Sequence, residues 1–167
     1  MSSPDWPSLP ATPATVNAQA ILEALRADAE LSGVLTEVRD AELADLVEDA
    51  AGLKAPLAAV SLYGETHQLA LGTASTLSTL LDVHVLTLPQ SKGTGGFARA
   101  RLVGSVLRVI YAHREILDGA GRQTATGIER LEQVSYTLPL RPNRMLLTTI
   151  RVHFVASYNE ATREVLV

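Results

Sequence analysis

A glycine-rich loop holds the residues that come nearest to a known chemical motif. Gly93, Gly95 and Ala98 match the GxGxxA pattern, which binds a dinucleotide when a tight turn joins a strand to a helix. Here the loop is long, and a helix continues where the pattern requires an acidic residue closing the next strand. Lys92 precedes the glycines, so the P-loop pattern fails as well. We interpret Gly93–Gly96 as part of a loop that is either mobile or placed at a subunit interface or facing a channel, with nucleotide binding as a remote alternative.

The histidines form no recognisable metal site. His67, His84, His113 and His153 show no two-ligand spacing with one another or with a carboxylate, and the chain has no cysteine. His84 and His153 fall in expected strands and could lie near each other, but we expect structural histidines with satisfied hydrogen bonds. No serine sits in a GxSxG turn. We therefore name no catalytic residue, no metal ligand and no cofactor, and expect a protein that is not an enzyme.

Acidic and basic side chains occupy different parts of the sequence. Carboxylates outnumber bases between Glu23 and Glu65, whereas arginines outnumber acids from Lys92 onward. The acids of the segment Ala41–Ala51 alternate around an expected helix, which is typical of a solvated face. The asymmetry gives either two differently solvated faces or, in a self-associating protein, complementary sides that orient neighbouring subunits.

Length and composition restrict the class of protein. A chain of 167 residues suits one domain and can bury a core without disulfides. Its net charge of −4 argues against affinity for nucleic acid through phosphate neutralisation. The first residues lack the charge and apolar run of a signal peptide, and no stretch approaches the length of a membrane span. We expect a soluble protein made in the cytoplasm, with no membrane partner.

The helices and strands that would position these residues are predicted from hydrophobic periodicity and from the positions of glycine and proline. We expect an α+β domain with a mostly antiparallel sheet and two main helices packed on it. The final strand is the clearest, with Ile150, Val152 and Phe154 on one face, and we expect its partner to be Gln133–Leu138. In the first half of the chain, the expected elements are a helix Ala18–Leu31 capped by Asn17, a strand Leu35–Arg39, a helix Ala41–Ala51 with Leu43, Leu46 and Val47 inward, and a strand Leu57–Tyr63 ended by Gly64. A long strand-like stretch follows at His67–Leu88, with irregularity at Gly72–Ser75. The second half is expected to contain a helix Phe97–Leu117, a turn Gly119–Gly121, a strand Thr126–Leu138 with Ile128, Val134 and Tyr136 inward, and a turn at Pro139 and Pro142.

Residues 1–15 form a separate, proline-rich region. Four prolines lead us to expect no helix or central strand here, so we assign residues 1–15 to an N-terminal arm and residues 16–167 to one domain. Trp6 is unusual in a solvated tail, because large aromatic side chains are usually buried. The arm is either a flexible tail or a segment that docks Trp6 on its own or a neighbouring subunit.

Several stretches together carry a resemblance to a known family. In this order the elements resemble tail-completion proteins of tailed bacteriophages, specifically the tail terminators of Mu-like contractile tails. The resemblance covers most of residues 17–160. The stretches are ILEALRADAELSG, PLAAVSLYGE, DVHVLTLP, ARARLVGSVLRVIYAHREIL, LEQVSYTLPL and MLLTTIRVHFVASYNE.

The resemblance implies a virion structural protein. It implies a ring, typically of six subunits, that caps the tail tube, ends its polymerisation and joins the tail to the neck. Expected partners are other copies of the chain, the tube protein, the sheath and a neck or head-completion protein. DNA is expected to pass through the lumen without sequence-specific binding. Another head-tail connector is the nearest alternative. The family transfers no catalytic residue, and we expect neighbours to contact Trp6, Lys92, Gly95, Arg99 and Arg101.

Overall fold

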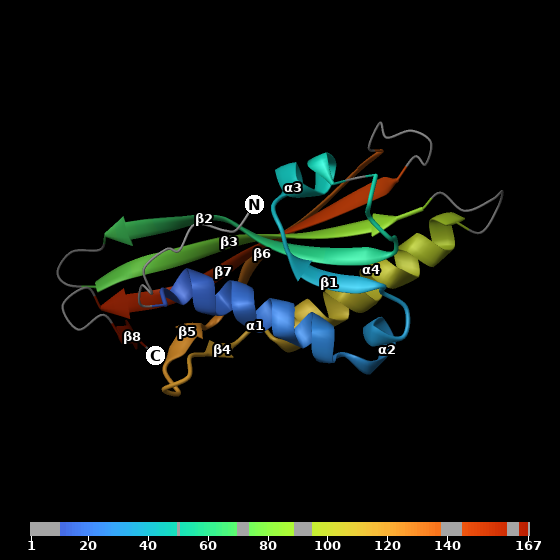
Figure 1. The fold of residues 1–167 in the computed structure, drawn as a ribbon. Coiled ribbons are helices and arrows are strands. Elements are labelled where there is room, and N and C mark those ends of the chain that lie inside the picture. The colour runs from blue at the N-terminus through green and yellow to red at the C-terminus, as the bar shows by residue number, and fades with distance from the viewer. Residues whose placement is uncertain are drawn as a thin grey trace.

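The computed structural model describes residues 11–49, 51–69, 74–88, 95–137, 145–159 and 164–166, and shows one large sheet with helices on its two faces (Figure 1). In chain order the elements are α1 (Pro13–Ala27), α2 (Ala29–Ser32), β1 (Glu37–Asp40), α3 (Leu43–Glu48), β2 (Leu57–Leu69), β3 (Ala74–Thr87), α4 (Gly95–Ala112), β4 (Ile116–Leu117), β5 (Gln123–Ala125), β6 (Gly127–Thr137), β7 (Leu146–Asn159) and β8 (Glu164–Leu166). The sheet has the order β1-β2-β3-β7-β6, and β8 also pairs with β7. Only β1 and β2 pair in parallel among these strands, which confirms the predicted α+β class.

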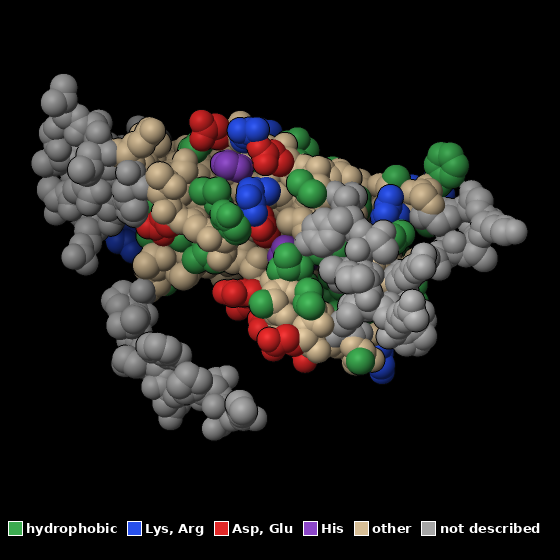
Figure 2. Space-filling model, turned by 90° about the horizontal axis from the view of Figure 1, so that it is seen from above, with side chains coloured by type: hydrophobic (Ala, Val, Ile, Leu, Met, Phe, Trp, Pro, Cys, Tyr) green, Lys and Arg blue, Asp and Glu red, His purple; other side chains and the backbone are tan. Residues whose placement is uncertain are grey.

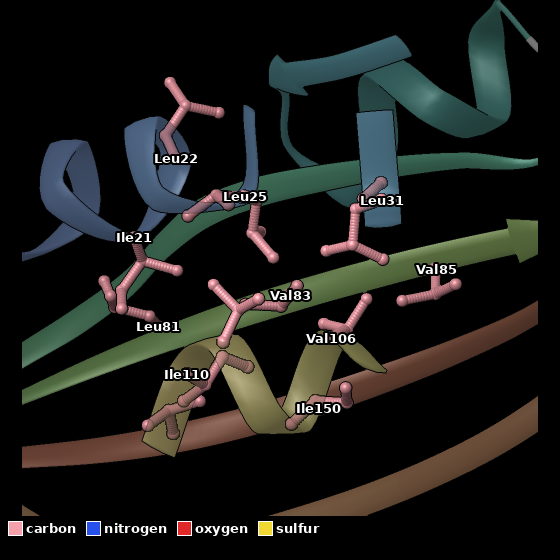
Figure 3. Packing of buried hydrophobic residues seen from close by; sticks show 14 of the residues in the cluster. Ile21, Leu22, Leu25, Leu31, Leu81, Val83, Val85, Val106, Ile110 and Ile150 are labelled. Atoms are coloured by element: carbon pink, nitrogen blue, oxygen red, sulfur yellow. The ribbon is translucent and has the colours of Figure 1, made fainter. Parts of the chain in front are cut away.

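The two long helices, α1 and α4, lie on the same face of the sheet and build the main core (Figure 1). Ile21 and Leu25 of α1 meet Val106 and Ile110 of α4 over the middle strands, as Figure 3 shows. Their spacing of three to four residues places them on one side of each helix. The prediction of two main helices packed on the sheet is therefore confirmed.

The short helix α3 lies on the opposite face and forms a second, smaller cluster. Leu46, which is fully buried, packs there with Leu57, Leu86 and Leu147 from three neighbouring strands. The structure confirms Leu46 as inward, but Val47 is 44% exposed, so its predicted burial is wrong. At about 3.6 residues per turn, Val47 is rotated by about 100° from Leu46, which faces the sheet.

Helix α1 begins earlier than predicted. Pro13 occupies the first turn, where its missing N–H has no intrahelical partner to lose. Thr12 caps the helix, accepting from the Thr15 amide while the Thr15 side chain accepts in return from the Thr12 amide. The predicted start at Ala18 with Asn17 as cap is wrong. Asn17 is instead buried within the helix, where its amide donates to Thr79 and to a backbone carbonyl and its oxygen accepts from Thr124.

Strand β2 does not end at Gly64, as the sequence predicts. It continues to Leu69, and the pairing with β3 shifts by one residue between Leu62 and Gly64, leaving Tyr63 as an extra residue. The expected long strand His67–Leu88 is two strands, β2 and β3, that pair antiparallel. Periodicity alone cannot show this, because both halves carry the same alternation.

Helix α4 is displaced toward the N-terminus relative to its predicted span. It begins at Gly95 and ends at Ala112, and Ile116 then enters the small sheet β4-β5 and is buried. Apolar residues at helical spacing continue beyond the end, which explains the overextended prediction. The predicted turn follows: Gly121 has φ of 78°, a left-handed conformation that favours glycine.

A one-residue bulge near the start of β6 reverses the side chains that follow it. Ile128 pairs with Phe154 and Leu131 with Val152, and the register shifts between Ile128 and Arg130. Ile128 and Leu131 both pack against the core, whereas Val134 is 54% exposed. The predicted burial of Val134 is wrong because one extra residue moves every later side chain to the other face. The pairing of this strand with the last strand is confirmed. The Tyr136 side chain and the predicted turn at residues 139–143 lie outside the described residues.

Substitution of valine by alanine should change the free energy of unfolding very differently on β7 and on β6. Val152→Ala removes two methyl groups from a fully buried site and should lower the free energy of unfolding by about 2–3 kcal/mol. Val134→Ala should cost no more than about 1 kcal/mol, because the site is exposed. Urea denaturation of both variants measures the difference. Equal losses would show that Val134 points into the core, as an unshifted alternation predicts.

Candidate assembly surfaces

The first two turns of α4 form the first candidate surface, which we call the helix-entry surface and define as Gly96, Phe97, Arg99 and Arg101. The phenyl ring of Phe97 is 77% exposed, an unusual state for a large aromatic side chain. Arg101 is exposed and Arg99 is half-buried. An apolar ring beside cationic groups at the end of a helix is the composition of a protein contact.

Three of the five predicted contact residues fall on or beside this surface. Gly95 begins α4 and so belongs to the helix, not to the loop as predicted, while Arg99 and Arg101 follow within two turns. Lys92 and Trp6 lie outside the described residues. The sequence prediction missed Phe97, because its exposure depends on where α4 begins.

Another arginine of α4 is engaged within the chain. Arg108 donates to Asp28 at 2.9 Å and to Glu30 at 3.0 Å, which ties α4 to α2. The amide of Leu31 and the Arg108 guanidinium both lower the pKa of Asp28. Arg108 therefore pairs within the chain at an exposed site, where an ion pair adds little stability.

The second candidate surface is the face of the sheet that carries α3, here called the open sheet face. Figure 2 shows acidic side chains gathered at one side of it and side chains of both charges, with histidine, over its middle. Exposed acids of the α3 region lie on this side of the molecule: Glu42, Asp45, Glu48 and Asp49. The separation of acidic and basic residues in the sequence predicts such a distribution. The acidic region lies apart from the arginines of α4.

An ion pair crosses the centre of the open sheet face. The Arg151 guanidinium donates through Nε and Nη2 to the two carboxylate oxygens of Asp82, at 2.8 and 2.9 Å. It also lies 3.7 Å from the centre of the Tyr63 ring, and Asp82 is nearly buried. Hydrogen bonding to Asp82 raises the pKa of Arg151, so the guanidinium stays charged. Neither group is presented as a free acid or base, which favours a structural role.

His84 lies one row further along the same face and is buried. Its Nε2 is 3.2 Å from the Ser61 hydroxyl and its Nδ1 is 2.9 Å from the Thr149 hydroxyl. A nucleophile and base pair would need a carboxylate to orient the imidazole and an accessible hydroxyl. Here a hydroxyl takes that position, and the Ser61 side chain is buried. The contacts confirm the prediction of a satisfied structural histidine at this position.

His153 does not join His84. The register pairs His84 with Thr149 and His153 with Leu80, which separates the two rings by four residue pairs along the sheet. A buried Nε2 of His153 has no hydrogen-bond partner among the described residues, so the prediction of a satisfied histidine is wrong there. Within the same part of the chain, no three histidines or carboxylates gather in a way that could hold a metal ion.

The sequence prediction did not single out Asp82, Arg151 or Tyr63. Two of them were visible as charged residues in the middle of otherwise apolar strands, which is a signal for a paired charge. Tyr63 could not be found this way, because the bulge in β2 turns it toward Arg151.

Two sheet edges on opposite sides complete the candidate surfaces. In the described part of the chain, β6 has β7 as a neighbour on one side and no strand on the other. At the opposite edge, β1 covers only Leu57–Val60 of β2, and β3 is the one strand that pairs with residues beyond Val60 in the part of the chain that the structure describes. Unpaired backbone groups at a sheet edge can hydrogen-bond to a strand of another chain.

Comparison with known proteins shows a shared fold. Neither protein-family models nor curated proteins give a match to the sequence. Among solved structures, a chain of "Virion of native gene transfer agent (GTA) particle" is similar, with 20% identity and a TM-score of 0.53. The match covers 83% of this chain and 93% of that chain, so it extends over nearly the whole of the other protein. No helix of the described residues is long and apolar enough to cross a membrane.

Burial of His84 should make stability depend on pH. Burial lowers the pKa of His84, opposed by the charge of Asp82 and reinforced by that of Arg151. The unfolded chain therefore binds the proton first, as the pH falls below about 6.5. Stability should be fully present above that pH and decrease below it, by at most about 1.4 kcal/mol per pH unit.

Urea denaturation at about pH 7.5 and about pH 5.5 measures this dependence, with His84→Gln as the variant that removes the titrating group. The protein should lose more stability between the two pH values than the variant does. An identical loss in both would show that His84 is not held neutral by the fold.

Proposed function

We propose that this protein is a virion structural protein whose copies form a ring that caps a tail tube, ends its polymerisation and joins the tail to the neck or head. The observation that carries the proposal is the fold shared with a chain from the virion of a gene transfer agent particle, over nearly all of that chain. The resemblance of the sequence to tail terminators supports the same role independently. In this role the protein is not an enzyme, and its activity lies in its surfaces.

The arrangement of surfaces supports a closed ring. A ring needs two different patches, on opposite sides of a subunit, that fit each other. The sheet provides two such sides, the β6 edge and the edge formed by residues 61–69 of β2. The acidic region around α3 and the arginines of the helix-entry surface add charge that favours one orientation over others. Six subunits is the number that the resemblance implies.

The partners follow from this position in the particle. Besides copies of itself, the ring contacts the tube protein, the sheath, and a neck or head-completion protein. DNA passes through the lumen without sequence readout, which is compatible with a net charge of −4. Another head-tail connector would use the same kind of ring, and the place of the ring in the particle distinguishes the two roles.

The exposed ring of Phe97 gives the sharpest test of the assembly role. Phe97→Ser should leave the free energy of unfolding within about 0.5 kcal/mol, because the side chain makes little contact within the chain. It should nevertheless reduce the fraction of closed oligomer measured by light scattering, and the incorporation of the protein into particles. Tyr111→Ser is the matched control, since Tyr111 is a 53% exposed aromatic on the same helix, near its other end.

Equal assembly of the two variants would contradict a role for the helix-entry surface. A terminator can also assemble only at the tip of a tube, so incorporation into particles decides the test when the free protein is a monomer. Failure of the wild-type protein to enter particles at all would contradict the proposed function itself.

A further inference from the structure

A groove between α1 and the β4-β5 turn is unfilled by the described residues. It has a volume of about 420 Å³. Val16, Ala20 and Leu117 give it an apolar floor and wall, and Glu23 and Asp118 stand among its lining residues. Leu117 is 61% exposed, although it lies in a strand beside the main core. An exposed leucine that borders an apolar groove offers a surface on which another apolar group can be buried.

We propose that this groove binds the N-terminal segment of the same chain, residues 1–10, with Trp6 as the anchor. The groove is lined by Ala11 itself, the residue that follows this segment. Trp6 lies five positions before Ala11, so their Cα atoms are at most about 17 Å apart when the chain is extended. Ala20 lies seven residues beyond the start of α1, a rise of about 11 Å. A segment running back along the helix therefore brings Trp6 beside Ala20 and Leu117.

The chemistry of the segment fits the groove. Trp6 and Leu9 are its large apolar side chains, and an indole is amphipathic, with one N–H that needs an acceptor. The Glu23 carboxylate accepts from Gln19 at 2.7 Å and has lone pairs left for the indole. Pro7 and Pro10 restrict the backbone of the segment, which lowers the entropy lost on docking. The inference does not depend on the proposed assembly role.

Fluorescence of the full-length protein tests this directly, because Trp6 is the only tryptophan. The emission of the folded protein should be blue-shifted relative to the protein in denaturant, and less accessible to acrylamide. Leu117→Glu should abolish both effects. Val34→Glu is the matched control, since Val34 is a similarly exposed aliphatic residue outside the groove, and it should preserve both. A thermal melt by circular dichroism establishes that each variant is folded. If Leu117→Glu does not fold, Leu117→Ser replaces it in the same measurements.

A cysteine pair identifies the occupant, because the chain has no cysteine of its own. Ser8→Cys, which keeps the anchor Trp6, combined with Leu117→Cys should form a disulfide within one chain, whereas Ser8→Cys with Val34→Cys should not. Disulfide-linked dimers would show that a second copy supplies the segment and would overturn the proposal. Solvent-like Trp6 emission that Leu117→Glu leaves unchanged would overturn it as well.

Discussion

The register between β3 and β7 is the constraint on which the rest of the structure depends. The two strands pair without a shift from Ala74 opposite Asn159 to Thr87 opposite Leu146. Side chains alternate between the two faces of a sheet. This register therefore places Val83 and Ile150 against α1 and α4, and it places Asp82 and Arg151 on the open sheet face. A slip of one residue would turn one of the two strands over and place either Asp82 or Arg151 in the apolar layer, where an unpaired charge has a large desolvation cost.

Two single-residue bulges add detail to this frame. The bulge at Tyr63 brings its ring over Arg151, and the bulge near the start of β6 carries Glu132 to the position paired with Arg151. The bulges therefore gather charged and aromatic side chains around one guanidinium on the open sheet face. They also leave Val134 exposed on the strand that forms the sheet edge, which is where a neighbouring chain would approach.

Much of this fold is predictable from the sequence, and the errors have identifiable physical causes. The apolar stripes of α1 and α4 and the alternation of β7 indicate their structure directly, because each buries one face over several turns or residue pairs. The start of α1 is misjudged because Pro13 is read as a helix breaker, although a proline is well tolerated in a first turn. The sequence predicts an irregularity at Gly72–Ser75 but not the division of this stretch into β2 and β3, because the same alternation is found in both strands. The exposure of Val134 is not predictable from periodicity, because a bulge interrupts the alternation of β6.

The candidate surfaces are less predictable than the fold. Arg99 and Arg101 stand out as arginines near glycines, but the exposure of Phe97 depends on how α4 begins, which no local pattern determines. The pair of Asp82 and Arg151 joins residues far apart in the chain and requires the strand pairing to be known. Surfaces that act by contact leave no spacing rule in the sequence comparable to that of a metal or nucleophile site.

A sheet with helices on its two faces and edges on opposite sides, together with an exposed aromatic at a helix start and separated charge, supports a subunit that works by assembly. The most direct measurement is imaging of purified particles by electron microscopy, with the position of this protein identified in the reconstruction. The account predicts a single closed ring at the junction of tail and neck, in which the helix-entry surface contacts a neighbouring protein. Absence of the protein from the particle, or its presence outside any ring, would contradict it.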